Sequence, residues 1–333
     1  MAKRNRRSRD ERQIIDMFSY RRPCGSKTER AFIDRFLSPL GFWEDEFGNL
    51  ILQIGEHPTI LWSSHVDTVH RAEGMQTVHY DGSFLRLTKR SLRDGSNCLG
   101  ADDTAGVWLM TEMIKAKVEG VYVIHFGEES GCIGSSALAK HKPDFFEGIK
   151  AAIAFDRMGY EDVITHQVGG RTASDAFARS LSKILGGSFK PCDGGVYTDT
   201  NEYAHLVPEC TNVSVGYFGQ HGHRETQDVP FLISLRNTLV AADWSGLVIE
   251  REPGDDDRYD YGFGSSRLSY GRGASSARGL EDLVKAYPDV VADLLESCGV
   301  SRGDLMDHIS HHYGQAFEDD EDDFWWGPGR AAA

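Results

Sequence analysis

The feature that most constrains the fold of this chain is an alternation of short apolar runs with longer amphipathic stretches between residues 10 and 250. The runs NLILQIG and TILWSS read as neighbouring strands, and GVYVIHF, AAIAF and TNVSVGY read as later ones. The stretch DDTAGVWLMTEMIKAK reads as a helix with Val107, Met110 and Ile114 on one face. This rhythm is typical of a sheet with helices on its faces. We therefore predict a three-layer α/β fold with a mixed, mostly parallel sheet, followed by a small helical C-terminal tail.

Changes in composition divide the chain into predicted segments. We expect residues 1–12 to form a flexible basic arm and residues 13–250 to form the main domain. Residues 251–278 are rich in Gly, Ser and Asp, a composition typical of a linker. A small helical module is predicted over residues 279–316, and an acidic, disordered tail over residues 317–333.

The net charge limits the possible partners. A formal charge of −15 disfavours binding to nucleic acid or to an anionic membrane surface. The helical module has the outline of a helix-turn-helix, but Asp304 and Asp307 outnumber the single Arg302 on its second helix, which makes it a poor surface for phosphates. We interpret the module as a docking or oligomerising hairpin, and the C-terminal tail as a possible binding segment for a protein partner.

The cysteines and the hydropathy pattern indicate the compartment. The cysteines form no C-x-x-C pair, which indicates reduced thiols rather than a disulfide framework. No apolar run is long enough to span a bilayer, and no apolar segment follows the basic N-terminus. We therefore expect a cytoplasmic protein. The six cysteines are Cys24, Cys98, Cys132, Cys192, Cys210 and Cys298.

Imidazoles and carboxylates follow the predicted strands or open the predicted helix. In an open α/β sheet, ligands bind beyond the carboxyl ends of the strands, so we expect these side chains to converge. Converging carboxylates raise one another's pKa, and a bound cation relieves their repulsion. Imidazole and carboxylate ligands without thiolates suit Zn²⁺ and admit Co²⁺ or Mn²⁺. The residues concerned are His65, Asp67, Asp102, Asp103, Glu128, Glu129, Asp156, His221 and His223.

Five segments, in this order, resemble the signature blocks of the co-catalytic di-zinc exopeptidases, the superfamily of peptidase T, carboxypeptidase G and the zinc aminopeptidases. They are SSHVDTV, LGADDTAGV, GEESGCIGS, AFDR and GQHGHRE. The segments EDEFGNLILQIG and GGVYTDTNEY resemble its flanking regions, so the resemblance covers roughly residues 28–245. Each block is weak alone, but the ordered set is specific. The resemblance implies the zinc-exopeptidase fold and hydrolysis of an amide bond.

The resemblance also implies a ligand set for two zinc ions. His65, Asp102 and Asp156 would hold one ion, and Asp102, Glu129 and His221 would hold the other, so that Asp102 bridges them. A non-proline cis peptide bond after Asp102 is implied as well.

Two further residues receive roles through the resemblance, which also favours one histidine of a pair. Glu128 would be the general base that takes a proton from water. Asp67 would accept a hydrogen bond from the second ring nitrogen of the ligand His65 and so fix its tautomer. His221 is preferred to His223 as a ligand because the superfamily's spacing of His, three residues and Glu is met through Glu225.

The chain departs from the peptidase T branch in two respects, which leave its function open. The segment between Asp156 and CDGGVYTDTNEY is too short for the lid or dimerisation domain of that branch, and Thr104 stands where a Lys commonly follows the aspartate pair. We expect an exopeptidase acting on short peptides, preferably from the amino end, although carboxypeptidase activity stays open. One alternative is a deacylase acting on a non-peptide amide such as an N-acyl amino acid. Another is a catalytically silent module that binds a partner through its C-terminal tail.

Overall fold

The computed structural model describes residues 7–253 except residue 169, together with the isolated positions 284, 288, 291, 292, 295 and 305. The chain divides into two compact units, Met1–Gly273 and Ala274–Ala333, and the elements named below all lie in the first. Apart from the isolated positions, the predicted helical module (279–316) and acidic tail (317–333) lie outside the described residues, as does the predicted linker beyond residue 253.

The described part of the first unit alternates strands and helices, as the sequence pattern predicts. Its α-helices are α1 (Arg9–Met17), α2 (Lys27–Phe32), α3 (Lys89–Arg93), α4 (Ala101–Lys115), α5 (Ile133–His141), α6 (Asp175–Ile184), α7 (Asp199–Glu202) and α8 (Val229–Ala241). Shorter helical turns are η1 (Ile33–Leu37), η2 (Ser38–Leu40), η3 (Pro143–Phe146) and η4 (Trp244–Gly246). The strands are β1 (Tyr20–Arg21), β2 (Trp43–Glu44), β3 (Leu50–Ile54), β4 (Ile60–His65), β5 (Gly74–Met75), β6 (Val78–Tyr80), β7 (Phe84–Leu87), β8 (Gly120–His125), β9 (Ala151–Arg157), β10 (Asp162–Ile164), β11 (His166–Gln167), β12 (Gly170–Arg171), β13 (Lys190–Cys192), β14 (Glu209–Ser214), β15 (Tyr217–Phe218) and β16 (Thr226–Asp228).

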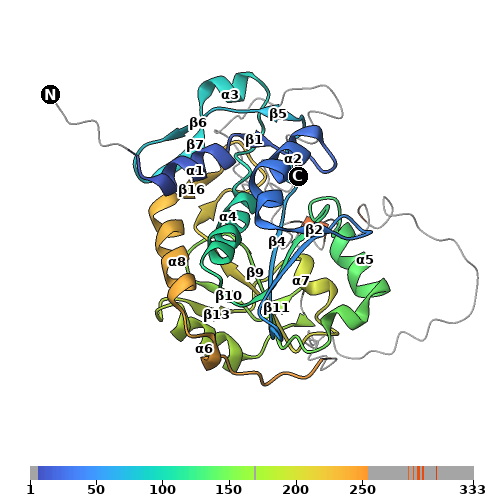
Figure 1. Cartoon of the computed structure of the whole chain (residues 1–333). Coiled ribbons are helices and arrows are strands. Elements are labelled where there is room, and N and C mark those ends of the chain that lie inside the picture. The colour runs from blue at the N-terminus through green and yellow to red at the C-terminus, as the bar shows by residue number, and fades with distance from the viewer. Residues whose placement is uncertain are drawn as a thin grey trace, which may run out of the picture. The chain divides into compact units, whose positions relative to one another are not determined.

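The central sheet has eight strands in the order β13-β10-β14-β9-β4-β8-β3-β2. In Figure 1 its strands β4, β9 and β10 lie between α8 on one side and α5 on the other. Its centre is parallel, because β14 pairs with β9, β9 with β4, and β4 with β8 in parallel, whereas β3 and β2 continue the sheet antiparallel. The prediction of a mixed, mostly parallel sheet is confirmed. The prediction that β3 and β4 are neighbours is wrong, since β8 forms hydrogen bonds with both and lies between them.

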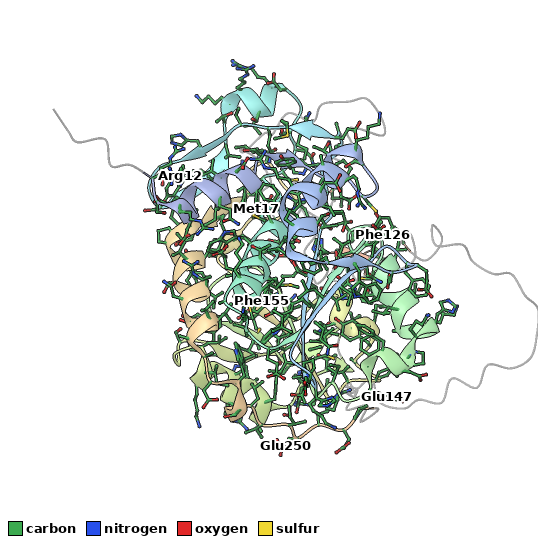
Figure 2. All side chains as sticks on the ribbon, viewed as in Figure 1. Arg12, Met17, Phe126, Glu147, Phe155 and Glu250 are labelled. Carbon is green, nitrogen blue, oxygen red and sulfur yellow. The ribbon has the colours of Figure 1, made fainter. Side chains whose placement is uncertain are left out.

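Two apolar cores separate the sheet from helices on both faces. Alternate residues of β4 point to opposite faces, as they do in any strand. Trp62 lies in the core on the side of α4 and α8, and Leu61 lies in the core that contains Leu138 of α5. The Trp62 indole stacks on Phe155 with ring centroids 5.9 Å apart. Phe155 is labelled in Figure 2. The architecture is therefore helix, sheet, helix, as predicted.

A smaller antiparallel sheet, in the order β15-β16-β7-β6, packs against α4 through β15 and β16. The loop between β15 and β16 carries His221. This ligand candidate therefore comes from a second sheet, not from the end of a central strand as the sequence analysis expected.

The ends of the main domain differ from the prediction. Helix α1 begins at Arg9, so the flexible arm predicted over residues 1–12 is wrong for its last residues. The helix starts there because the Ser8 hydroxyl accepts the Glu11 N–H while the Glu11 carboxylate accepts the Ser8 N–H, which is a capping box. At the other end, the buried Arg251 guanidinium donates to main-chain carbonyls just before β14, so the domain includes the first residue of the predicted linker.

The described cysteines, Cys24, Cys98, Cys132, Cys192 and Cys210, are free thiols, as predicted, and Cys298 lies outside the described residues. Burial raises the pKa of the Cys98 and Cys210 thiols, so both act as small apolar groups. Among the described helices, none combines the length and the apolar character needed to cross a bilayer.

Candidate active site

Three of the predicted ligands meet at one edge of the central sheet. His65 is the last residue of β4, Asp156 lies near the end of the parallel neighbour β9, and Asp102 lies in the first turn of α4. The ends of parallel neighbours lie at the same edge, which brings the first two side chains together. The peptide bond between Asp102 and Asp103 is cis, as the resemblance implied.

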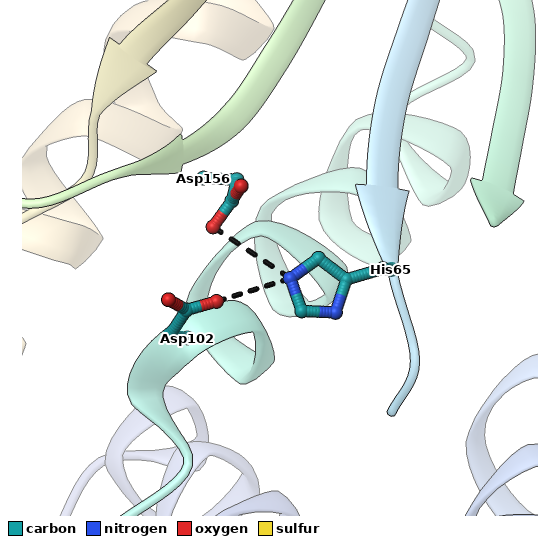
Figure 3. Close-up of side chains that lie close together, drawn as sticks. All are labelled: His65, Asp102 and Asp156. Atoms are coloured by element: carbon teal, nitrogen blue, oxygen red, sulfur yellow. Dashed lines mark hydrogen bonds and ion pairs between the residues drawn. The ribbon is translucent and has the colours of Figure 1, made fainter. Parts of the chain in front are cut away.

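His65, Asp102 and Asp156 surround one point (Figure 3). The His65 Nε2 atom lies 3.0 Å from Asp102 Oδ1 and 3.7 Å from Asp156 Oδ1. Ligand atoms about 2 Å from a tetrahedral zinc ion lie roughly 3.3 Å from one another. The observed separations are close to this spacing, so the three side chains could hold one divalent ion.

A second cluster shares Asp102. The His221 Nε2 atom lies 3.2 Å from Asp102 Oδ2 and 3.3 Å from Glu129 Oε1. The two oxygens of Asp102 therefore face two different imidazoles, which is the arrangement expected of a carboxylate that bridges two ions. In each cluster the ligand atoms lie within 4.8 Å of one another, as do those of a third group, His65, Glu128 and Glu129, which shares one residue with each cluster. His223 is exposed and belongs to neither cluster.

The electrostatics of the clusters fit bound cations. Burial and the charge of Asp102 raise the pKa of Glu129 to about 7 and the pKa of Asp156 to about 6. Glu129 Oε1 is also buried, and apart from the ion-pair contact with His221 Nε2 at 3.3 Å it has no hydrogen-bond partner among the described residues. A carboxylate oxygen in this state is costly to bury unless a cation or a donor compensates it. The donor set consists of imidazoles and carboxylates, which suits zinc.

Asp67 contacts two parts of the site, His65 and the loop that carries Glu128 and Glu129. The His65 Nδ1 atom lies 3.1 Å from the main-chain oxygen of Asp67 and 3.4 Å from its carboxylate Oδ1, so the nearer acceptor is the main chain rather than the predicted carboxylate. The fully buried carboxylate accepts the N–H groups of Glu128 and Glu129 at 3.2 Å each. Asp67 thus connects the end of β4 to the loop that carries both glutamates.

Glu128 borders the first cluster. Its Oε2 atom lies 4.0 Å from His65 Nε2, and its Oε1 atom lies 3.8 Å from the Cys132 sulfur. Burial raises the pKa of Glu128, and the charges of Asp156 and Glu129 act in the same direction. Apart from the weak thiol contact, no described hydrogen bond occupies the carboxylate, so it is available to accept a proton.

Several supporting residues had no role in the sequence analysis. Thr198 Oγ1 donates to Asp156 Oδ2 at 3.0 Å, and the Tyr217 hydroxyl donates to Asp156 Oδ1 at 3.3 Å. The fully buried Arg22 donates to the Val66 carbonyl at 2.7 Å and, through another nitrogen, to the hydroxyl of Thr104. Thr198 lies in the segment GGVYTDTNEY, whose resemblance to the superfamily could have pointed to it. Nothing in the sequence pattern pointed to Arg22 or Tyr217.

Comparisons with known proteins relate part of this chain to a peptidase family. Residues 49–207 match the sequence pattern of Peptidase family M28. A curated relative, the uncharacterized protein YqjE of Bacillus subtilis (strain 168), is 39% identical over 101 residues, which is 27% of this chain. The match spans 25% of the length of that relative.

Solved structures show the same fold at low sequence identity. Aminopeptidase PepT from Bacillus cereus superposes with a TM-score of 0.56 at 17% identity, over 70% of this chain and 96% of the other. A tripeptidase from Staphylococcus aureus gives a TM-score of 0.55 at 16% identity, with the same coverage of 70% and 96%.

The fold, the two clusters and the family match together define a domain of the metallopeptidase class. Within that class, the match of residues 49–207 and the shared fold are consistent with the resemblance to the co-catalytic zinc exopeptidases.

Proposed function

We propose that this protein is a di-zinc exopeptidase that removes residues from the amino end of short peptides. The observation that carries the proposal is the pair of clusters that share Asp102, whose two oxygens each lie within 3.2 Å of a different imidazole nitrogen. His65, Asp102 and Asp156 would hold one Zn²⁺, and Asp102, Glu129 and His221 the other, with Co²⁺ or Mn²⁺ as substitutes. When bound, such a pair of cations lowers the pKa of water and polarises the scissile carbonyl.

The side chains of this chain supply the proton transfers. Glu128 accepts a proton from the attacking water, whose oxygen bonds to the scissile carbonyl carbon. The carbon–nitrogen bond then breaks, and Glu128 returns the proton to the leaving amine. Asp67 keeps the two glutamates in place, because its carboxylate accepts both of their N–H groups.

The preference for the amino end rests on the shape of the domain and on its neighbours. Within the described residues, the chain between β9 and β14 forms short strands together with α6 and α7 rather than a separate lid domain. A compact catalytic domain of this kind resembles the zinc aminopeptidases. The structural neighbours are named an aminopeptidase and a tripeptidase, which supports short peptides as substrates.

A metal count and a substrate panel test the proposal. The full chain is reconstituted with zinc, its metal content is measured, and hydrolysis of dipeptides and tripeptides is compared with that of N-acetylated peptides and N-acyl amino acids. We expect two zinc ions per chain, and cleavage of the substrates with a free amino end that a chelator abolishes. Cleavage of N-acyl amino acids alone would support a deacylase. Less than one zinc per chain without hydrolysis would support a non-catalytic module.

A further inference from the structure

Glu225 is a buried carboxylate that connects two loops of the candidate site. It lies at the base of the β15–β16 hairpin, directly before β16, and only 1% of its surface is exposed. The loop of this hairpin carries His221, and its last turn is closed by the Glu225 N–H, which donates to the Gly222 carbonyl at 3.1 Å. The backbone of Glu225 is therefore fixed in the same loop as the ligand candidate His221.

The carboxylate accepts four consecutive main-chain N–H groups. Its Oε2 atom accepts those of Leu99 and Gly100, both at 2.7 Å. Its Oε1 atom accepts those of Ala101 at 2.8 Å and Asp102 at 3.2 Å. Consecutive N–H groups that converge on one anion form a strong anion-binding concavity. Here the anion is a side chain of the protein, and the last of the four donors belongs to the shared ligand Asp102.

The start of α4 requires such an acceptor. Asp102 and Asp103 have non-helical backbone angles, so the N–H groups of residues 99–102 precede the regular part of α4 and have no partner within that helix. Gly100 has no side chain to cap them. Gly100 has a φ of +73°, and a Cβ there would lie 2.9 Å from the His70 ring, so a capping side chain does not fit this position. A carboxylate from elsewhere satisfies these donors, whereas Asp103 caps the regular part of α4 by accepting the Gly106 N–H at 2.9 Å.

We propose that Glu225 is a positioning residue of the second cluster: it holds the backbone of Asp102 against the loop that carries His221, and thereby sets the affinity for one of the two metal ions. This inference rests on the proposed di-zinc site. Replacing a residue that orients metal ligands typically lowers metal affinity or activity by about 10- to 100-fold. Loss of Glu225 affects the His221 cluster more than the His65 cluster, because the latter lies at the ends of paired central strands.

Glu209 offers a matched control. It is also a fully buried carboxylate with four donors: the N–H of Ser174 at 2.6 Å, the Ser174 hydroxyl at 2.8 Å, the Glu250 N–H at 2.8 Å and the Arg251 N–H at 2.9 Å. None of these partners belongs to either cluster. A change at Glu209 therefore has a comparable cost for folding, but has no reason to affect metal binding.

The experiment compares Glu225→Gln with Glu209→Gln in the full chain. A glutamine keeps the shape but replaces one acceptor oxygen with an N–H₂ group that faces two N–H donors. Metal-free protein is titrated with Co²⁺ and Zn²⁺, and amide hydrogen exchange is measured over residues 99–102. For Glu225→Gln we expect about 10- to 100-fold weaker binding of one ion, near-normal binding of the other, and faster exchange at these amides. Glu209→Gln should bind both ions like the wild type.

The outcomes separate this inference from the proposed function. A wild-type chain that binds fewer than two ions contradicts both. If the wild type binds two ions and Glu225→Gln binds both equally well, only the role of Glu225 is overturned. An equal loss of affinity in Glu209→Gln also overturns it, because the effect is then one of general stability. Should Glu225→Gln fail to fold, the shorter Glu225→Asp provides the same comparison, with an intermediate loss expected for one ion.

Discussion

Glu128 offers the sharpest test of the proposed chemistry, through the substitution Glu128→Gln. The amide has the size and shape of the carboxylate but cannot accept a proton at neutral pH. None of the atoms assigned to either metal ion is altered, since the clusters that share Asp102 use Glu129 and not Glu128. The substitution therefore separates proton transfer from metal binding.

The expected magnitude follows from the surroundings of Glu128. A positioned general base contributes about 10²- to 10⁴-fold to a rate, which corresponds to roughly 3–5 kcal/mol of activation free energy. The only described hydrogen bond to the carboxylate is the weak one from the Cys132 thiol at 3.8 Å, so little stability is lost. Glu129 and Asp156 lie nearby as like charges. Removing one charge from this group should stabilise the metal-free protein while the turnover falls.

Three measurements on Glu128→Gln test this reasoning: kcat on a dipeptide, bound zinc per chain, and the Tm of the metal-free protein. We expect kcat to fall by about 10²- to 10⁴-fold, with wild-type zinc content and an unchanged or raised Tm. Glu147→Gln, at an exposed position outside the site, should match the wild type in all three. A Glu128→Gln protein that keeps zinc and near-wild-type kcat would refute the assignment of Glu128 as the base.

Three further predictions concern metal binding and stability. Thr198→Val removes the hydroxyl that donates to Asp156 at 3.0 Å. We expect zinc affinity, measured by competition with a chelator, to fall by about 10- to 100-fold. Unchanged affinity would show that Thr198 does not orient Asp156 for metal binding. Burial raises the pKa of Glu29 from 4.5 to about 7. Between these pH values the folded state holds a proton that the unfolded state has lost, so the free energy of unfolding should decrease as pH rises from 4.5 to 7. Urea titrations across this range should show a smaller decrease for Glu29→Gln, and an identical decrease would contradict the assignment. Trp62→Ala should lower the free energy of unfolding by about 3–5 kcal/mol, because the indole is fully buried, whereas Trp43→Ala, at a side chain that is 55% exposed, should change it by less than about 0.5 kcal/mol.

The sequence predicted the central strands well because each is a continuous apolar run. β4, β8 and β9 are buried on both faces, and their sequences show it directly. The order of strands was harder, since β3 and β4 are consecutive in the chain but are separated in the sheet by β8. Such pairing depends on contacts between distant segments, which local patterns do not encode. The short strands of the smaller sheet, such as β6 and β15, are too brief to give a periodic signal.

The candidate ligands were predictable because they lie in local motifs, whereas their supports were not. His65 and Asp156 follow apolar runs, so their place at the sheet edge could be inferred from the strands alone. The hydrogen bonds of Thr198 and Tyr217 to Asp156 join residues 42 and 61 positions apart in the chain. No spacing rule predicts such contacts, because they depend on how loops pack once the sheet has formed.

The contrast between His65 and His221 shows how two kinds of structure contribute to one site. The His65 side chain is 1% exposed and follows a strand whose hydrogen bonds to β8 and β9 fix its position. His221 is 39% exposed, has a φ of +64°, and lies in a loop between two short strands of the smaller sheet. The central sheet alone cannot position such a residue. Glu225 accepts hydrogen bonds from the start of α4 and so connects the loop that carries His221 to Asp102, the residue common to both clusters. The block GQHGHRE therefore contains both the ligand candidate His221 and, four residues later, the residue that holds its loop in place.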